Sequence, residues 1–177
     1  WIGKIFKNID VRDYGSKNAG TTNALRVFGI KAGALTFIVD VLKSLLACFI
    51  GMKLLGLSGI LLAGIFVVIG HNWPIFLNFK GGKGIASSFG FIMFLDYKIA
   101  IVAIIIFIII VILTKYISLG SMLTTTLVLP ISYIFFGYRN IYVLLTFLFL
   151  ASLSIFRHNS NIIRLINGNE NKIKIKK

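Results

Sequence analysis

Residues 80–84 combine two lysines with three glycines, a composition that could bind an anion. Glycine leaves backbone N–H groups accessible, and successive N–H groups can form an anion-binding concavity. Two ammonium groups flank this backbone. The segment therefore predicts a phosphate site formed by Lys80, Gly81, Gly82, Lys83 and Gly84. Its spacing differs from the GxxxxGKS/T pattern of an ATP-binding loop, so we do not expect a nucleotide.

A second polar segment, residues 14–26, precedes a helix expected to begin near Thr22. Loop hydroxyls and the unpaired N–H groups of a helix N-terminus bind phosphate well. A plain helix cap and turn would use the same residue types. The candidate phosphate-binding residues of this segment are Ser16, Asn18, Thr22, Asn23 and Arg26.

A third polar segment, residues 158–170, follows the last apolar run. On a helix, His158, Asn161 and Arg164 are three residues apart and share one face. Asn161 and Arg164 could bind a phosphate group there. An amphipathic helix lying on lipid headgroups would show the same spacing.

Two histidines stand beside apolar runs, where either could handle the proton of a reacting hydroxyl group. His71 lies at the end of the second run, and His158 follows the last one. An interfacial histidine without a catalytic task is the alternative for both.

The composition is that of an integral membrane protein. Of the 177 residues, 58% are hydrophobic and only 14% are charged, and the mean hydropathy is +0.94. A soluble domain needs more charge on its surface. The net charge of +14 comes from basic residues placed mostly between apolar runs, which favours membrane orientation and small anionic ligands over nucleic acid. We expect no metal site, because the histidines, the cysteine and the acids lack ligand spacing.

The apolar runs predict an all-α polytopic bundle that forms a single domain over residues 1–177. The expected membrane segments are about 33–50, 55–70, 85–96, 99–114, 118–136 and 140–156. The third is marginal, since a crossing takes about 20 helical residues. With six segments, fifteen basic residues lie on one side and three on the other. This asymmetry predicts that the three polar segments share the cytoplasmic face.

Asp40 and Lys43 lie one helical turn apart inside the first expected membrane segment. Charges within a membrane are costly and usually paired, so we expect a structural pair, in which Asp40 could also orient a cationic side chain on the cytoplasmic side. Cys48 lies in the same apolar run and is expected to pack there.

Three ordered blocks carry a resemblance to one family. They read GSxNxGxTNxxR over residues 15–26, GHxxPxFLxFKGGKG over 70–84 and HxxNIxRLxxGxExK over 158–172. The chain thereby resembles the bacterial membrane-bound acyl-phosphate:glycerol-3-phosphate acyltransferases, the PlsY family. Lys17 stands where that family usually has glycine. The family has seven helices, and because this chain begins without methionine we expect its first helix upstream of residue 1.

The resemblance implies transfer of a fatty acyl group from acyl-phosphate to the 1-hydroxyl of sn-glycerol 3-phosphate, which gives lysophosphatidic acid and phosphate. It implies no cofactor, and catalytic roles for Arg26, His71, Lys83 and His158. The implied partners are the two substrates, membrane lipid and the enzyme that makes the acyl-phosphate. The implied location is the bacterial cytoplasmic membrane, with the active site on its cytoplasmic face.

Two other functions would explain part of the pattern. A transporter of organic phosphates or anions could recruit its substrate with basic loops, although the sequence shows no internal repeat of the kind typical of transporters. A protein that only binds lipid surfaces would explain the basic tail but not the glycine pair between lysines.

Overall fold

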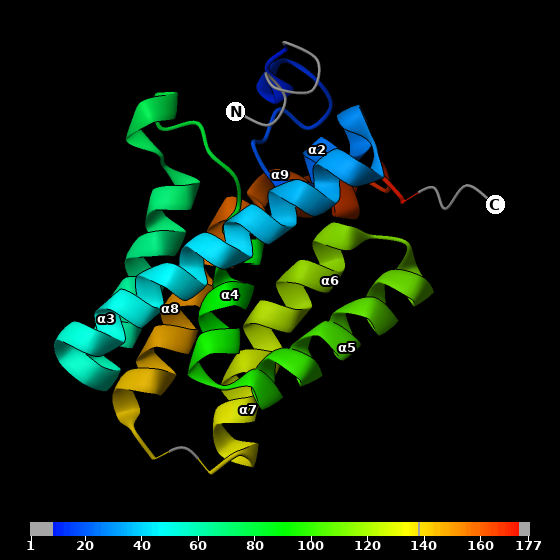
Figure 1. Cartoon of the computed structure of the whole chain (residues 1–177). Helices are drawn as coiled ribbons and strands as arrows, with labels where there is room; N and C mark the ends of the chain where they lie inside the picture. The colour runs from blue at the N-terminus through cyan, green and yellow to red at the C-terminus, as the bar shows by residue number, and fades with distance from the viewer. Residues whose placement is uncertain (1–8, 138, 174–177) are drawn as a thin grey trace. The chain divides into compact units, whose positions relative to one another are not determined.

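The computed structural model describes residues 9–137 and 139–173, and all the regular structure within them is helical. Figure 1 shows the elements in chain order. The chain divides into two compact units, Trp1–Leu95 and Asp96–Lys177.

The first unit is built around one long helix that turns back on itself. It contains η1 (Val11–Asp13), α2 (Thr21–Phe28), α3 (Ile30–Asn72), η2 (Ile75–Leu77) and α4 (Ile85–Leu95). α3 leaves helical geometry at Leu55 and Gly56, where Gly56 has φ +57°. Glycine adopts this left-handed conformation without steric cost. The break gives α3 an outgoing and a returning arm (Figure 1).

Small residues allow the arms of α3 and the short helix α4 to pack closely. A Cβ atom on Gly51 or Gly59 would overlap the carbonyl oxygen of the other, so the two arms meet backbone to backbone. Phe91 of α4 is fully buried and lies where a side chain on Gly64 would be. The core of this unit therefore depends on glycines that admit a neighbouring backbone or ring.

The second unit contains α5 (Tyr97–Thr114), α6 (Ile117–Leu123), the π-helical segment η3 (Thr124–Val128), α7 (Leu129–Phe135), α8 (Ile141–Arg157) and α9 (Asn159–Ile166). α5 is rich in isoleucine and valine, which favour strands in water. In a lipid environment the backbone must satisfy its own hydrogen bonds, and a helix does so within one segment.

The π-helical segment lies just before Pro130, which has no N–H group to continue the regular hydrogen-bond ladder. Its Thr125 hydroxyl donates to Ser154 Oγ of α8 over 2.8 Å. After α9 the chain folds back, and the backbone N–H of Ile173 donates to the carbonyl of Lys115 over 2.8 Å.

The helices confirm an all-helical membrane protein at a coarse level. Three helical segments of the described chain are long and apolar enough to cross a membrane, or four if the bent pair α8 and α9 forms one span. The break at Leu55 and Gly56 lies at the start of the expected segment 55–70, so α3 contains both that segment and the segment 33–50. α4 has only 11 residues, fewer than the ~20 that a full crossing requires. The count of six membrane segments therefore stays a prediction, as does the assignment of one domain.

Candidate functional site

The loop before α2 is wound around the side chain of Asn23, which is only 1% exposed. The Asn23 amide donates to the carbonyls of Val11, Tyr14 and Asn18 at 2.9, 3.1 and 3.0 Å. Its Oδ1 accepts from the Ser16 backbone N–H at 2.8 Å. Asn23, predicted to contact substrate, is therefore seen holding the loop in shape, and contact with substrate stays a prediction.

Two positions in this loop adopt left-handed backbone conformations. Gly15 has φ +61°, and a Cβ there would overlap Asn23 Oδ1. Lys17 has φ +58°, a conformation that glycine adopts more readily than lysine. This explains physically why a glycine would suit position 17, and it shows that the turn forms with lysine in place.

α2 begins at Thr21, one residue before the expected start, with Gly20 as its N-cap. Asn18 donates from its side chain to the Ser16 carbonyl over 2.9 Å. Arg26 lies in the last turn of α2 and is exposed. The side chain of Arg26 is thus available to solvent, while the side-chain amides of Asn18 and Asn23 shape the loop.

Arg12 joins the loop before α2 to the short helix η2. Its Nη1 donates to the carbonyl of Leu77 in η2 over 2.8 Å, and its Nε donates to both carboxylate oxygens of Asp10 at 3.0 Å. The hydrogen bond that Arg12 donates to Asp10 raises the pKa of Arg12 above its ordinary value. Sequence reasoning did not predict this link, because Arg12 is only one basic residue in a polar loop.

The glycines of residues 80–84 let the loop lie directly on the last turn of α3. The N–H of Gly82 donates to the carbonyl of His71 over 3.1 Å. A Cβ on Gly81 would overlap that carbonyl, and a Cβ on Gly82 would overlap His71 Nε2. Lys80 is exposed, Lys83 is half-buried and Gly84 is buried with φ +80°. The glycines are therefore required for contact with α3, beside any role in binding an anion.

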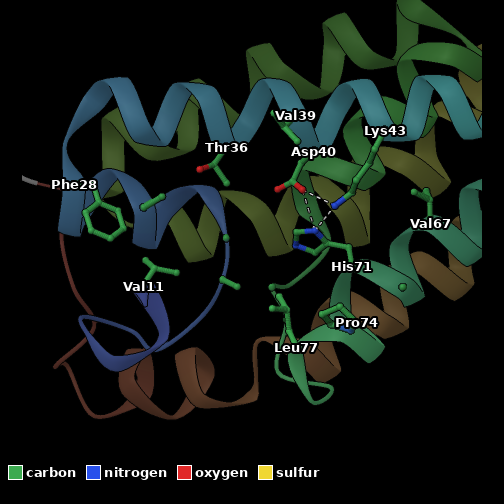
Figure 2. A pocket seen from close by; sticks show the side chains of 16 residues that line it. Val11, Phe28, Thr36, Val39, Asp40, Lys43, Val67, His71, Pro74 and Leu77 are labelled. Carbon is green, nitrogen blue, oxygen red and sulfur yellow. Dashed lines mark hydrogen bonds and ion pairs between the residues drawn. The ribbon is translucent and has the colours of Figure 1, made fainter. Parts of the chain in front are cut away.

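His71 is the meeting point of a polar cluster between the two arms of α3. Its Nδ1 lies 3.1 Å from Asp40 Oδ1 and 2.7 Å from Lys43 Nζ. Lys43 Nζ is itself 2.5 Å from the same Asp40 oxygen. Figure 2 shows the three side chains converging. The expected pair of Asp40 and Lys43 is confirmed, and the returning arm adds His71 to it.

This cluster opens onto a cavity of about 400 Å³ within the first unit (Figure 2). Most of its wall is apolar, and its polar side chains are those of Thr36, Asp40, Lys43 and His71. Gly20 from residues 14–26 and Gly81 and Gly82 from residues 80–84 also line it. An apolar cavity with a few convergent polar groups suits an amphiphilic ligand.

Among the predicted site residues of this unit, the structure places His71, Gly81 and Gly82 in the cavity wall. The other predicted residues lie outside the set that lines it: Ser16, Asn18, Thr22, Asn23, Arg26, Lys80, Lys83 and Gly84.

The predicted residues of the third segment gather around Glu170 in the second unit. The Glu170 carboxylate accepts from Asn161 Nδ2 at 2.9 Å and from Arg164 Nε at 2.8 Å. It also accepts from the Ser118 hydroxyl at 3.2 Å. A guanidinium has five N–H donors, and this contact uses only Nε. Glu170 was not among the predicted site residues, although it lies in the third sequence block.

His158 is buried at the end of α8. Its Nδ1 lies 2.8 Å from the carbonyl oxygen of Ser154. A carbonyl only accepts, so Nδ1 carries the proton in this contact. The three predicted residues His158, Asn161 and Arg164 are thus brought together within their own unit. Their convergence with the first two segments stays a prediction.

The helices and the cavity define a membrane protein with a mostly apolar cavity beside a glycine-lysine loop. Comparison with known proteins refines this class. Residues 1–168 match the family model described as glycerol-3-phosphate acyltransferase. The chain belongs to the glycerol-3-phosphate acyltransferase family, which confirms the resemblance seen in the three sequence blocks.

Similar proteins share this family description along most of their length. A glycerol-3-phosphate acyltransferase of Finegoldia magna is 46% identical over 176 residues, covering 97% of this chain and 86% of the relative. One from Thermoanaerobacter sp. is 48% identical over 170 residues, covering 96% and 85%.

Two crystal structures of PlsY (YgiH), an integral membrane glycerol 3-phosphate acyltransferase, are also similar. The glycerol 3-phosphate form has a TM-score of 0.89 and 32% identity, and the match covers 98% of this chain and 88% of that one. The lysophosphatidic acid form has a TM-score of 0.87 and 31% identity over the same shares.

Proposed function

We propose that this chain transfers a fatty acyl group from acyl-phosphate to the 1-hydroxyl of sn-glycerol 3-phosphate, giving lysophosphatidic acid and phosphate. Family membership supports the acceptor and the product, because the similar crystal structures are of forms with those two molecules. The observation in this chain that carries the proposal is the cavity, whose apolar wall ends at His71 and the glycine loop. Family membership and the similar crystal structures favour an enzyme over a transporter.

The reaction needs no covalent intermediate on the protein. Acyl-phosphate is a mixed anhydride with phosphate as its leaving group. The 1-oxygen of glycerol 3-phosphate bonds to the acyl carbon, the bond from that carbon to the phosphate oxygen breaks, and the hydroxyl proton passes to an acceptor. The protein can therefore act by aligning the substrates and stabilising developing negative charge.

Both substrates are anions, and each phosphate monoester carries about −1.5 to −2 charges near neutral pH. Bringing them together requires several cations. We assign this task to Arg26, Lys80, Lys83 and Arg164, with hydrogen bonds from the remaining predicted residues. The exposed side chains of Arg26 and Lys80 support the assignment, as does the guanidinium of Arg164, whose contact with Glu170 uses one nitrogen.

We place the reaction on the cytoplasmic face of the bacterial cytoplasmic membrane, in a bundle with six segments in this chain. The asymmetric distribution of lysine and arginine supports this orientation. The enzyme that makes the acyl-phosphate is a proposed partner, since a substrate with a fatty chain and a reactive anhydride is best delivered at the membrane.

Phosphate release by the detergent-purified protein tests the proposal, with palmitoyl-phosphate as donor and with or without glycerol 3-phosphate. We expect release that depends on the acceptor and that falls at least tenfold in Lys83→Ala, since a charged hydrogen bond to phosphate contributes about 1.5–3 kcal/mol. Lys98→Ala is the matched control, because Lys98 is an exposed lysine at the start of α5 and should retain activity. Folded protein without acceptor-dependent release would contradict the proposal, and movement of labelled phosphate ester across vesicles would then favour a transporter.

A further inference from the structure

The two histidines of this chain have different partners at the same ring nitrogen. His158 Nδ1 faces a backbone carbonyl, that of Ser154, at 2.8 Å. His71 Nδ1 faces the ammonium of Lys43 at 2.7 Å and the carboxylate of Asp40 at 3.1 Å. Because the partner of one ring nitrogen decides which nitrogen carries the proton, the two rings need not do the same chemistry.

An ammonium group has three donors and no acceptor. Lys43 Nζ can therefore meet His71 Nδ1 at hydrogen-bond distance only if that nitrogen offers a lone pair. The same ammonium also donates to Asp40 Oδ1, which lies closer to Lys43 than to His71. A protonated Nδ1 could donate to Asp40, but its N–H would then lie against the ammonium. The shorter contacts thus favour a neutral ring with its proton on Nε2.

Nε2 is the ring atom that lies next to the glycine loop. A Cβ on Gly82 would overlap it, and both His71 and Gly82 line the cavity. An N–H group at Nε2 of His71 would be a hydrogen-bond donor in the wall of this mostly apolar cavity. Hydrogen bonds from fixed donors to developing negative charge are stronger in such surroundings than in water.

We propose that Asp40 and Lys43 are positioning residues that hold His71 as its Nε2-protonated neutral form, from which it donates a hydrogen bond to an oxygen of the acyl-phosphate. The identity of that ligand rests on the proposed function, whereas the protonation of the ring does not. In this form His71 cannot take the hydroxyl proton, because its lone pair is on Nδ1 and is engaged by Lys43. His71 then serves as an electrophilic donor and not as a general base.

The direct test is nitrogen NMR of the full chain in detergent, without substrate, after labelling the imidazole rings with ¹⁵N. The chain has two histidines, so spectra of His158→Gln assign the remaining signals to His71. We expect the unprotonated nitrogen of His71 to be Nδ1. His158 provides an internal reference, in which Nδ1 should be the protonated nitrogen. An unprotonated Nε2 in His71, or a doubly protonated ring, overturns the proposal.

Lys43→Met tests the positioning role, because it removes the donor to Nδ1 and leaves Asp40 to accept from that nitrogen. We expect the His71 proton to move to Nδ1 and kcat to fall roughly ten- to hundredfold, with little change in the KM for glycerol 3-phosphate. Lys43→Arg retains a donor and should recover much of kcat. Lys53→Met is the matched control, since Lys53 lies on α3 with its ammonium 5.6 Å from the centre of the Phe49 ring.

The outcomes separate this inference from the proposed function. Lost activity in Lys43→Met with an unchanged His71 protonation state would overturn the positioning role. If Lys43→Met does not fold, the spectra of the unaltered protein still decide the protonation state. A protein without acyl transfer but with Nδ1 of His71 unprotonated would contradict the proposed function and leave the assigned form of the ring standing.

Discussion

Each unit of the chain contains one buried carboxylate that collects polar partners, and the two differ in how they are built. Asp40 is 7% exposed and shares a helix with Lys43, while His71 arrives from the returning arm of α3. Glu170 comes from the segment after α9 and binds side chains of α6 and α9. The cluster around Asp40 forms part of the cavity wall. The cluster around Glu170 fixes the segment after α9 to α6 and α9. Substitutions of the Asp40 cluster should therefore alter chemistry more than stability, and substitution of Glu170 should do the reverse.

Glu170→Ala should have the largest effect. It leaves Arg164, Asn161 and Ser118 without their common acceptor. Glu170 is buried but the Arg164 side chain is 33% exposed, so the loss should be smaller than the roughly 3–5 kcal/mol that breaking a fully buried charge pair costs. We expect a strongly lowered Tm in detergent, measured by thermal unfolding of the purified protein, and low yield. Glu170→Gln keeps an acceptor oxygen for Asn161 and Ser118 and should lose less. Equal Tm values for Glu170→Ala and the unaltered protein would contradict a role of Glu170 in stabilising the second unit.

Gly82→Ala should affect activity more than stability. Its methyl group would overlap His71 Nε2, and relieving such overpacking costs about 1–3 kcal/mol. We expect the loop to move away from His71 and the acyl-transfer rate to fall at least tenfold. Gly70→Ala is the control, because Gly70 lines the same cavity and no atom lies within 4 Å of the Cβ that alanine would add there. Similar rates for the two variants would mean that contact between the loop and His71 is not needed.

Arg12→Met removes the link between the loop before α2 and η2. The guanidinium is partly exposed, so the expected loss of stability is about 1 kcal/mol. We expect a higher KM for the acceptor with a smaller change in kcat, since the loop before α2 is no longer fixed to Leu77. Arg12→Lys should be intermediate, because lysine retains one donor but not the fork that binds Asp10 and Leu77 together. A change confined to kcat would argue against a role in loop placement.

Thr125→Val should have the smallest effect of the four. It removes the hydroxyl that donates to Ser154 Oγ but preserves the shape of the side chain. A single neutral hydrogen bond contributes about 1 kcal/mol. We expect a slightly lowered Tm and unchanged kinetics, which would show that the second unit tolerates loss of a link between helices better than loss of Glu170. A drop in kcat would instead connect η3 to catalysis.

Local patterns predicted what depends on residues near one another in sequence. Apolar runs indicated helices in a membrane, and the three-residue spacing of Asp40 and Lys43 indicated their pair. His71 joins that pair only because α3 breaks at Gly56 and returns. A contact across 31 residues depends on the angle of that break, which hydropathy does not encode.

The polar segments show a second limit of sequence reasoning. Asn23 has the residue type of a phosphate ligand, yet its amide holds backbone carbonyls of its own loop. Arg12 carried no distinguishing local signal, because its contact with Leu77 spans 65 residues. Glu170 lies in the third sequence block, but its type alone did not indicate that it would bind Asn161 and Arg164. Residue type thus identified which segments are polar, and only the folded chain separates side chains that shape a loop from those exposed to solvent.

The measurement that tests the central claim most directly is the stoichiometry of the reaction. Purified protein would be incubated with palmitoyl-phosphate and glycerol 3-phosphate, and phosphate and lysophosphatidic acid would be quantified together, the latter by mass spectrometry. We predict one lysophosphatidic acid for each phosphate released, and neither product when glycerol 3-phosphate is omitted. Phosphate release without lysophosphatidic acid, or release that is indifferent to the acceptor, would contradict acyl transfer by this chain.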